Sequence, residues 1–126
     1  MAQPTVASRL QRRIAFISSD AALGQVLRGV LPAGWEFTQT TDLAALGDFA
    51  AVLQYRFLLL DLDDAAFDPL EVIDTVRREM MLNVAILCLG GDAAQRDAAR
   101  LARADRFFGR DAAADVLRQF CGQYDW

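Results

Sequence analysis

Hydrophobic and polar positions along the chain follow two alternating patterns, short apolar runs and longer segments with helical spacing. A short apolar run that ends in polar residues is typical of a buried strand. The expected strands cover residues 14–17, 35–38, 57–61, 84–89 and 106–108. The segments between them therefore decide which class of fold the chain adopts.

The segments after the expected strands have apolar residues at i, i+3, i+4 and i+7, the spacing of one face of a helix. Ser, Thr or Asp at their beginnings, or Pro in the first turn, favours helix starts. The expected helices cover residues 20–31, 41–53, 69–76, 92–104 and 111–120. Their expected apolar positions include Val26 on the first helix, Phe49 and Leu53 on the second, and Leu70 on the third.

Five strand–helix repeats predict an α/β fold with a doubly wound parallel sheet and helices on both faces. No linker or internal repeat divides the chain, so residues 1–126 are expected to form a single domain. Residues 1–12 are small, polar or charged for the most part, and we expect them to form a flexible N-terminal extension.

The charged residues exclude several kinds of chemistry. All 13 basic residues are Arg, and the chain has no His. Catalysis by a lysine Schiff base, a phosphate-loop lysine or a histidine base is therefore excluded. The net charge of −4 argues against nucleic acid or an anionic membrane as a partner. Two Cys in apolar segments favour reduced core residues in a cytoplasmic protein.

Asp61 is the most informative single residue, because it directly follows the apolar run Phe57–Leu60. In open α/β sheets, ligands bind outside the carboxyl ends of the strands. The sequence therefore predicts that Asp61 lies at the rim of a pocket. Asp63 and Asp64, in the loop that follows, are expected to form a turn or interact with solvent.

From about Arg13 to Phe120, the chain resembles the receiver domains of bacterial response regulators, both in its five strand–helix repeats and in the aspartate that ends the third strand. The resemblance implies a flavodoxin-like sheet of strand order 2-1-3-4-5. It also implies that Asp61 stands at the phosphoacceptor position. Asp63 stands where the family offers a backbone carbonyl to Mg²⁺.

Several positions depart from the receiver pattern. Ser18 and Ser19 replace the two acidic metal ligands, and Asp20 comes one position later. Cys88 replaces the hydroxyl residue that ends the fourth strand, and Arg110 replaces the lysine after the fifth. Mg²⁺ prefers oxygen ligands and one or two carboxylates. We therefore expect no cofactor, and a metal bound weakly, if at all, by Asp61, Asp63 and Asp20.

The resemblance and its departures together imply an atypical receiver, or pseudo-receiver, that is not an enzyme. Its expected role is in two-component signalling, where it would bind a histidine kinase or a downstream effector protein; a homodimer stays open. One alternative is a working phosphorelay receiver that is phosphorylated at Asp61. Another is a small aspartyl phosphatase, since Asp61-Leu62-Asp63 resembles the first motif of haloacid-dehalogenase-type phosphatases, although these need a lysine.

A stripe of arginines forms the candidate interaction face. Arg96, Arg100 and Arg103 follow i, i+4, i+7 spacing on the expected fourth helix, and Phe107 stands at the receivers' aromatic switch position. Receivers use the face of their fourth helix, fifth strand and fifth helix for dimerisation and output. The other interpretation is a solvated helix face in which Asp92 pairs with Arg96.

Overall fold

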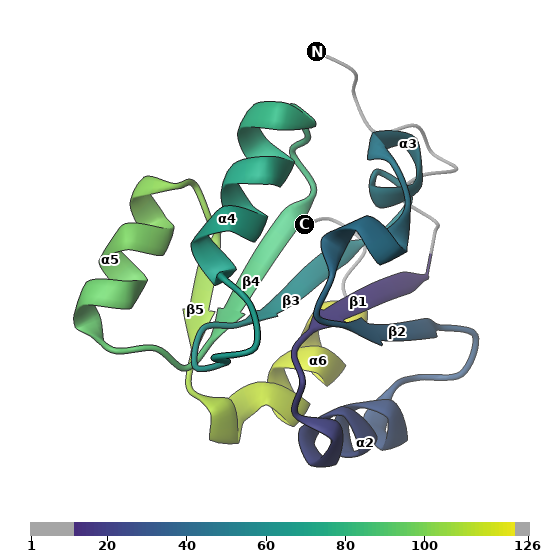
Figure 1. Ribbon diagram of the computed structural model, residues 1–126. Helices are drawn as coiled ribbons and strands as arrows, with labels where there is room; N and C mark the ends of the chain where they lie inside the picture. The colour runs from purple at the N-terminus through teal and green to yellow at the C-terminus, as the bar shows by residue number, and fades with distance from the viewer. Residues whose placement is uncertain (1–11, 123–126) are drawn as a thin grey trace.

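The computed structural model describes residues 12–122 and confirms the α/β fold. Five parallel strands form one sheet in the order β2-β1-β3-β4-β5 (Figure 1). The strands are β1 (Arg13–Ile17), β2 (Glu36–Thr40), β3 (Phe57–Asp61), β4 (Ala85–Leu89) and β5 (Arg106–Phe108). Apart from Arg12, the expected N-terminal extension lies outside the described residues.

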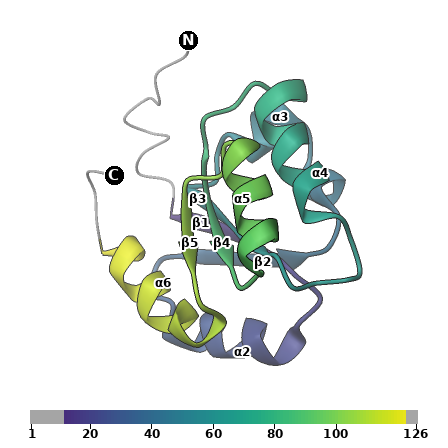
Figure 2. The ribbon, with the colours of Figure 1, turned by 90° about the vertical axis from the view of Figure 1, so that its left-hand side faces the viewer.

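Helical segments cover both faces of the sheet. They are α2 (Ala21–Val30), η1 (Leu43–Leu46), α3 (Phe49–Val52), α4 (Pro69–Asp74), η2 (Thr75–Glu79), α5 (Ala93–Leu101), η3 (Arg110–Ala112) and α6 (Ala113–Cys121). Figure 2 shows α2 and α6 on one face and α3, α4 and α5 on the other. Within residues 12–122, no helix is long and apolar enough to cross a membrane.

Strand β3 is buried along its whole length because both faces of the sheet are covered. Successive side chains point to opposite faces of a strand. Phe57 and Leu59 accordingly pack in the core below α2 and α6, whereas Leu58 and Leu60 pack below α3, α4 and α5. These two parts of the core, one on each face of the sheet, enclose β3 and so fix the position of Asp61 at its carboxyl end.

The prediction of one continuous helix over residues 41–53 is wrong. Gly47 adopts a φ of 107°, a conformation that side-chain-bearing residues rarely adopt, and it ends the 3₁₀ helix η1. Asp48 then caps the short helix α3. After the break, α3 buries Val52 in the core but leaves Phe49 59% exposed, and Leu53 beyond it is 39% exposed.

Other helices keep their places but differ in detail. Helix α5 ends at Leu101 instead of Ala104, and Arg103 beyond it adopts a positive φ of 79°. Val26 and Leu70, which were expected on buried helix faces, are 53% and 39% exposed. Strands and helix positions were thus easier to predict than the exact face that each helix buries.

A buried arginine joins three segments at the amino-terminal side of the sheet. Arg77, in the π-helical turn η2, is only 8% exposed. Its guanidinium donates hydrogen bonds to the backbone carbonyls of Arg103, Leu82 and Val84 and forms an ion pair with Asp105. Burial lowers the pKa of Arg77 from its ordinary value, although the nearby Asp105 opposes this change. Arg77 therefore connects η2 to the segment before β4 and to the loop between α5 and β5.

Candidate functional site

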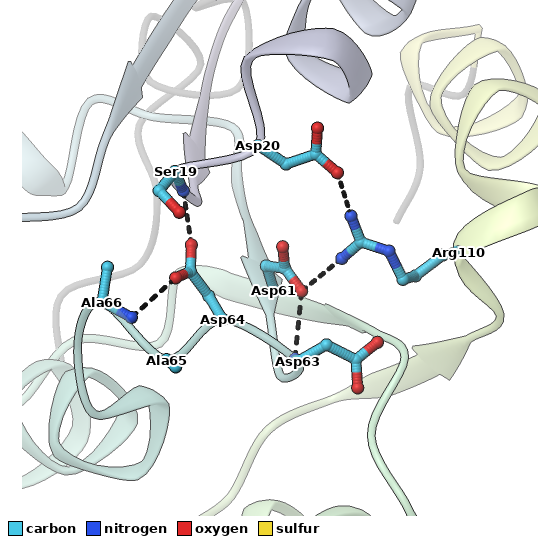
Figure 3. Close-up of a pocket in the computed structure, with 8 residues that line it drawn as sticks. All are labelled: Ser19, Asp20, Asp61, Asp63, Asp64, Ala65, Ala66 and Arg110. Atoms are coloured by element: carbon cyan, nitrogen blue, oxygen red, sulfur yellow. Dashed lines mark hydrogen bonds and ion pairs between the residues drawn. The ribbon is translucent and has the colours of Figure 1, made fainter.

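The candidate site is a cavity of about 400 Å³ at the carboxyl ends of β1 and β3. In the strand order 2-1-3-4-5, β2 is added on one side of β1 and β3 on the other, so the order of the strands reverses at β1 and β3. Such a switch point leaves a crevice in which ligands bind. The cavity is lined by Ser19, Asp20, Asp61, Asp63, Asp64, Ala65, Ala66 and Arg110 (Figure 3). Four carboxylates and one guanidinium therefore share a single opening.

Asp61 is almost completely buried, with 2% of its surface exposed. Its Oδ2 accepts a hydrogen bond of 2.7 Å from the hydroxyl of Ser18. Its Oδ1 accepts one of 3.0 Å from the backbone N–H of Asp63 and one of 2.5 Å from Nη1 of Arg110. Both carboxylate oxygens are thus engaged by groups of this chain, which satisfies the requirement that a buried charge be paired.

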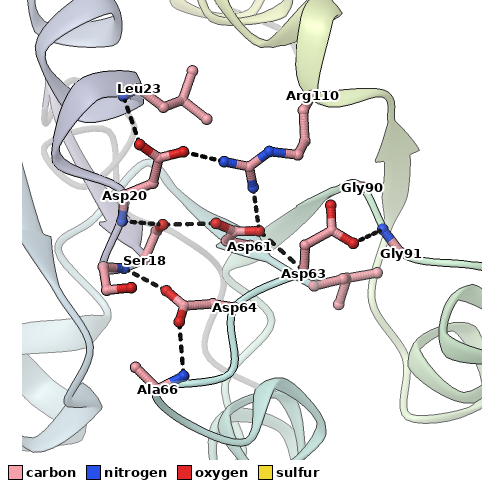
Figure 4. Close-up of polar contacts among 12 residues, drawn as sticks. Ser18, Asp20, Leu23, Asp61, Asp63, Asp64, Ala66, Gly90, Gly91 and Arg110 are labelled. Carbon is pink, nitrogen blue, oxygen red and sulfur yellow. Dashed lines mark hydrogen bonds and ion pairs between the residues drawn. The ribbon is translucent and has the colours of Figure 1, made fainter.

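Arg110 bridges two carboxylates of the site, those of Asp20 and Asp61 (Figure 4). Its Nη1 contacts Asp61, and its Nη2 forms an ion pair with Asp20. Asp20 is also the N-cap of α2, where its other oxygen accepts the N–H of Leu23. The pKa of Arg110 is raised, mainly by its hydrogen bond to Asp61, so the guanidinium stays charged. The bridge ties the start of η3 to β3 and α2.

The acidic loop after β3 is held by backbone amides on both sides. Asp64 accepts hydrogen bonds from the N–H groups of Ser19 and Ala66. Burial acts to raise the pKa of Asp64, but these amides outweigh it, so the pKa lies below its ordinary value. Asp63 accepts the N–H of Gly91, and a Cβ on Gly90 would lie only 2.0 Å from an oxygen of Asp63. Both carboxylates therefore shape the loop.

Sequence reasoning missed the contribution of Gln39 on the edge strand β2. Its side-chain amide donates to the carbonyls of Ser18 and Asp20, both at 3.0 Å, and so supports the loop that follows β1. Gly24 makes room for it, because a Cβ there would lie 1.9 Å from the Gln39 side-chain oxygen. A single polar residue on a short strand gives no sequence signal for this role.

Cys88 does not line the cavity. It pairs with Leu60 in the β3–β4 register and packs in the core below α3, α4 and α5. Burial raises the pKa of its thiol to about 12, with a further contribution from Asp105. The residue opposite Asp61 is Leu89, which is fully buried in the other part of the core. Neighbouring residues of a strand point to opposite faces of the sheet. Leu89 is therefore the β4 residue beside Asp61, and Cys88 points to the other face.

The residues of the site do not fit a bound Mg²⁺ ion. Magnesium requires near-octahedral oxygen ligands. Here the guanidinium of Arg110 already lies between Asp61 and Asp20, and its positive charge would repel a second cation. Asp63 directs its carboxylate toward Gly91. Among residues 12–122, no three Cys, Asp or Glu side chains are grouped so that they could hold a metal.

The arginine stripe is only partly formed. Arg96 donates to the carbonyl of Gly90, whereas Asp92, its expected partner, caps α5 together with Gln95. Arg100 pairs with Asp97 and lies over the ring of Phe107, with its guanidinium carbon 4.8 Å from the ring centre. Arg103 follows the helix in its left-handed conformation. The stripe therefore presents Arg100 and Arg103 as exposed charges, whereas Arg96 is only partly exposed.

The structure is similar to solved receiver domains. A signal receiver domain of a response regulator from Bermanella marisrubri matches with a TM-score of 0.68 and 23% identity, over 86% of this chain and 97% of that chain. The chain has the receiver-domain fold. A phosphorylated cyanobacterial phytochrome response regulator also matches with a TM-score of 0.68, at 16% identity over 88% of this chain and 89% of that chain.

The structure is also similar in fold to a domain of a eukaryotic protein. The receiver domain of a histidine kinase from Arabidopsis thaliana, complexed with Mg²⁺, matches with a TM-score of 0.62 and 15% identity, over 86% of this chain and 91% of that chain. No protein-family model and no curated protein matches the chain by sequence. The shared feature is thus the backbone arrangement, and the chemistry has to be argued from the side chains of this chain.

Proposed function

We propose that this chain is a signalling module of a two-component pathway that acts mainly by binding other proteins, with little or no phosphorylation of Asp61. We infer further that it works in the cytoplasm, is not an enzyme, and binds a histidine kinase or a downstream effector. The observation that carries the proposal is the contact of 2.5 Å between Arg110 and Asp61 in a receiver-domain fold.

The first argument concerns the nucleophile. Phosphoryl transfer needs a free carboxylate oxygen and cations that neutralise the transferring oxygens. Asp61 has Oδ1 bonded to Arg110 and Oδ2 bonded to Ser18. Approach of a phosphodonor would have to break at least one of these contacts. The guanidinium also stands between Asp61 and Asp20, where a metal ion would otherwise have to bind.

The second argument concerns the response to a phosphoryl group. A ligand shifts a conformational equilibrium only if it interacts differently with the two states. Opposite Asp61, the buried side chain of Leu89 has no hydroxyl that could bond a phosphoryl oxygen. Phe107 likewise has no hydroxyl, and its ring is covered by Arg100. These residues offer little that could report the state of Asp61 to the surface.

The third argument concerns the surface for partner binding, formed by α5, β5 and α6 and called here the output face. It includes Arg96, Arg100, Arg103 and Phe107, and Leu101 beside them is 87% exposed. Arginine and aromatic side chains are enriched in protein interfaces, which supports a binding role for this surface. The charges would steer an acidic partner, so association would depend on ionic strength.

Two sets of variants test the proposal in the source cells and with purified chain. Asp61→Asn is expected to leave the signalling output nearly intact. Arg96→Glu combined with Arg100→Glu is expected to weaken binding of the partner, identified by affinity capture, by about tenfold or more. Arg78→Glu is the matched control, because Arg78 is exposed on η2, away from the output face. If Asp61→Asn abolishes output and the arginine pair has no effect, the proposal is wrong.

A working phosphorelay receiver is the second candidate, and one observation favours it. Asp61 lies at the carboxyl end of β3 beside an open cavity of about 400 Å³, which has room for a phosphoryl group. On this alternative, Arg110 would turn from Asp61 to the phosphoryl oxygens, as arginine commonly binds such groups. Labelling of Asp61 by a small phosphodonor distinguishes the two candidates.

A further inference from the structure

A second cavity, of about 360 Å³, lies between η1 and the continuous segment of α4 and η2. It contains none of the residues that surround Asp61. Figure 1 shows α4 between α5 and the segment of η1 and α3. Because η1 and α4 line the cavity and no residue of α5, β5 or α6 does, the cavity is separate from the output face. Its volume is within the range of ordinary ligand pockets.

The cavity is next to the break at Gly47, which is one of its lining residues. The tight turn at this glycine brings Ala51 close, since a Cβ on Gly47 would lie 2.7 Å from the Ala51 side chain. The 3₁₀ helix η1 keeps Leu43 and Leu46 buried, and its residues Leu43 and Ala44 line the cavity. Phe49 is exposed on the helix that follows.

The lining of the cavity combines apolar and acidic side chains. Leu43, Phe67 and Met80 supply apolar surface, and Met80 can adapt to the shape of a bound side chain. Asp42, Asp68 and Glu71 supply the charge, and the lining contains no basic residue.

The three acidic residues differ in how free they are to bind a ligand. Asp42 and Asp68 each already accept a backbone N–H as helix caps. No described residue bonds to the carboxylate of Glu71, which lies exposed in the first turn of α4. Glu71 is therefore the acidic group most available to a ligand, and a cation next to an apolar chain is the ligand chemistry that fits.

We propose that this cavity, called here the α4 groove, binds a segment of a partner protein that has an Arg or Lys next to a large apolar side chain. The basic group would pair with Glu71, and the apolar side chain would lie against Leu43, Phe67 and Met80. A second copy of this chain fits less well, because each copy has a net charge of −4 and the two would repel. The α4 groove thus gives the chain a second contact surface beside the output face.

Peptide selection with the chain of residues 1–126 tests this proposal and does not require the partner to be identified first. A library of random displayed peptides is selected on immobilised wild-type chain, and the enriched peptides are synthesised. We expect them to combine Arg or Lys with Leu, Phe or Met. In NMR titrations they should shift the amide signals of Leu43, Val72 and Met80, and leave Arg100 and Phe107 unchanged.

The charge of Glu71 provides the decisive variant. Glu71→Arg is expected to weaken peptide binding by at least about tenfold. Glu79→Arg makes the same charge change on η2 outside the cavity, and should leave binding within about twofold. If Glu71→Arg fails to fold by circular dichroism, Glu71→Gln takes its place, with a smaller expected loss and the same order of the variants.

Several outcomes would overturn the inference. They are the absence of any enriched peptide, enrichment without basic residues, equal binding by the Glu71 and Glu79 variants, and shifts confined to the output face. A concentration-dependent dimer that Glu71→Arg abolishes would assign the groove to a second copy instead. Nuclear Overhauser contacts from residues 1–11 to Leu43 would assign it to the chain's own N-terminal segment. None of these results depends on whether Asp61 is phosphorylated.

Discussion

Nη1 of Arg110 lies 2.5 Å from Oδ1 of Asp61, although 49 residues separate them in sequence. The guanidinium side chain is about one-third exposed, whereas the carboxylate is almost completely buried. An arginine at the mouth of the site therefore neutralises a carboxylate at its base. Since the second nitrogen of the same group binds Asp20, three segments of the chain meet at one cation.

The first prediction concerns the energy of this contact. Arg110→Ala should lower the free energy of unfolding by about 2 kcal/mol, because it leaves a buried carboxylate without its cation. In a double-mutant cycle with Asp61→Asn, the two effects should not add, and the coupling should be about 1–3 kcal/mol. Urea unfolding of the four proteins measures it.

A cycle on Arg118 and Asp115 is the matched control for this coupling. That pair lies three residues apart on α6 and is exposed on both sides. Its coupling should not exceed about 0.5 kcal/mol. Equal couplings for the two pairs would mean that the Arg110–Asp61 contact is an ordinary surface ion pair.

The second prediction concerns metal binding. Mg²⁺ should bind the wild-type chain weakly or not at all, because Arg110 occupies the place of a cation and Ser18 and Ser19 are not carboxylates. Isothermal titration calorimetry should detect no submillimolar affinity. The triple variant Ser18→Asp, Ser19→Asp, Arg110→Lys should gain affinity, and adding Asp61→Ala should remove it. Submillimolar binding by the wild type that Asp61→Ala abolishes would contradict this.

The third prediction concerns the buried Arg77. Arg77→Met preserves much of the apolar stem but removes bonds to three carbonyls and to Asp105. Unsatisfied buried carbonyls are costly, so the free energy of unfolding should fall by about 3 kcal/mol. Arg78→Met, one residue later and exposed, should change it by less than about 0.5 kcal/mol. Comparable losses in both variants would remove any special role for Arg77.

The fourth prediction concerns pH. The pKa of Asp64 in the folded chain lies below its ordinary value of 3.8, because backbone amides of Ser19 and Ala66 stabilise the carboxylate against the effect of burial. Its contribution to stability is therefore complete above pH 3.8 and is lost as the pH falls through the folded-state pKa. The stability difference between wild type and Asp64→Asn should shrink over that interval. If the stability difference between the two proteins grew as the pH fell, the pKa of Asp64 would not be lowered in the folded chain.

The positions of the strands and of Asp61 could be predicted because they depend on apolar runs and on where each run ends. The break at Gly47 could not, because apolar spacing continued across it and suggested one helix. Here a backbone conformation at a single glycine overrode the periodicity.

Two features of the site, the β4 neighbour of Asp61 and the contacts of Arg110, could be predicted only in part from the sequence. The sequence indicated Cys88 as the neighbour of Asp61, whereas the register makes it Leu89. A sequence does not define the end and the register of a strand to the exact residue, and a shift of one residue moves a side chain to the other face of the sheet. The resemblance placed Arg110 at the site but gave no basis for predicting its simultaneous contacts with Asp61 and Asp20, since those depend on how β3, η3 and the start of α2 are positioned together.

The central claim is that Asp61 is held by Arg110 and is not a working phosphoacceptor, and direct labelling tests it. The purified chain of residues 1–126 is incubated with acetyl phosphate and Mg²⁺, and its intact mass is measured beside those of the Asp61→Asn variant and a phosphorylation-competent receiver. The account predicts that the competent receiver gains one phosphoryl group and that this chain and its variant do not. Stoichiometric labelling of the wild type that Asp61→Asn abolishes would contradict the account and establish a phosphorelay receiver.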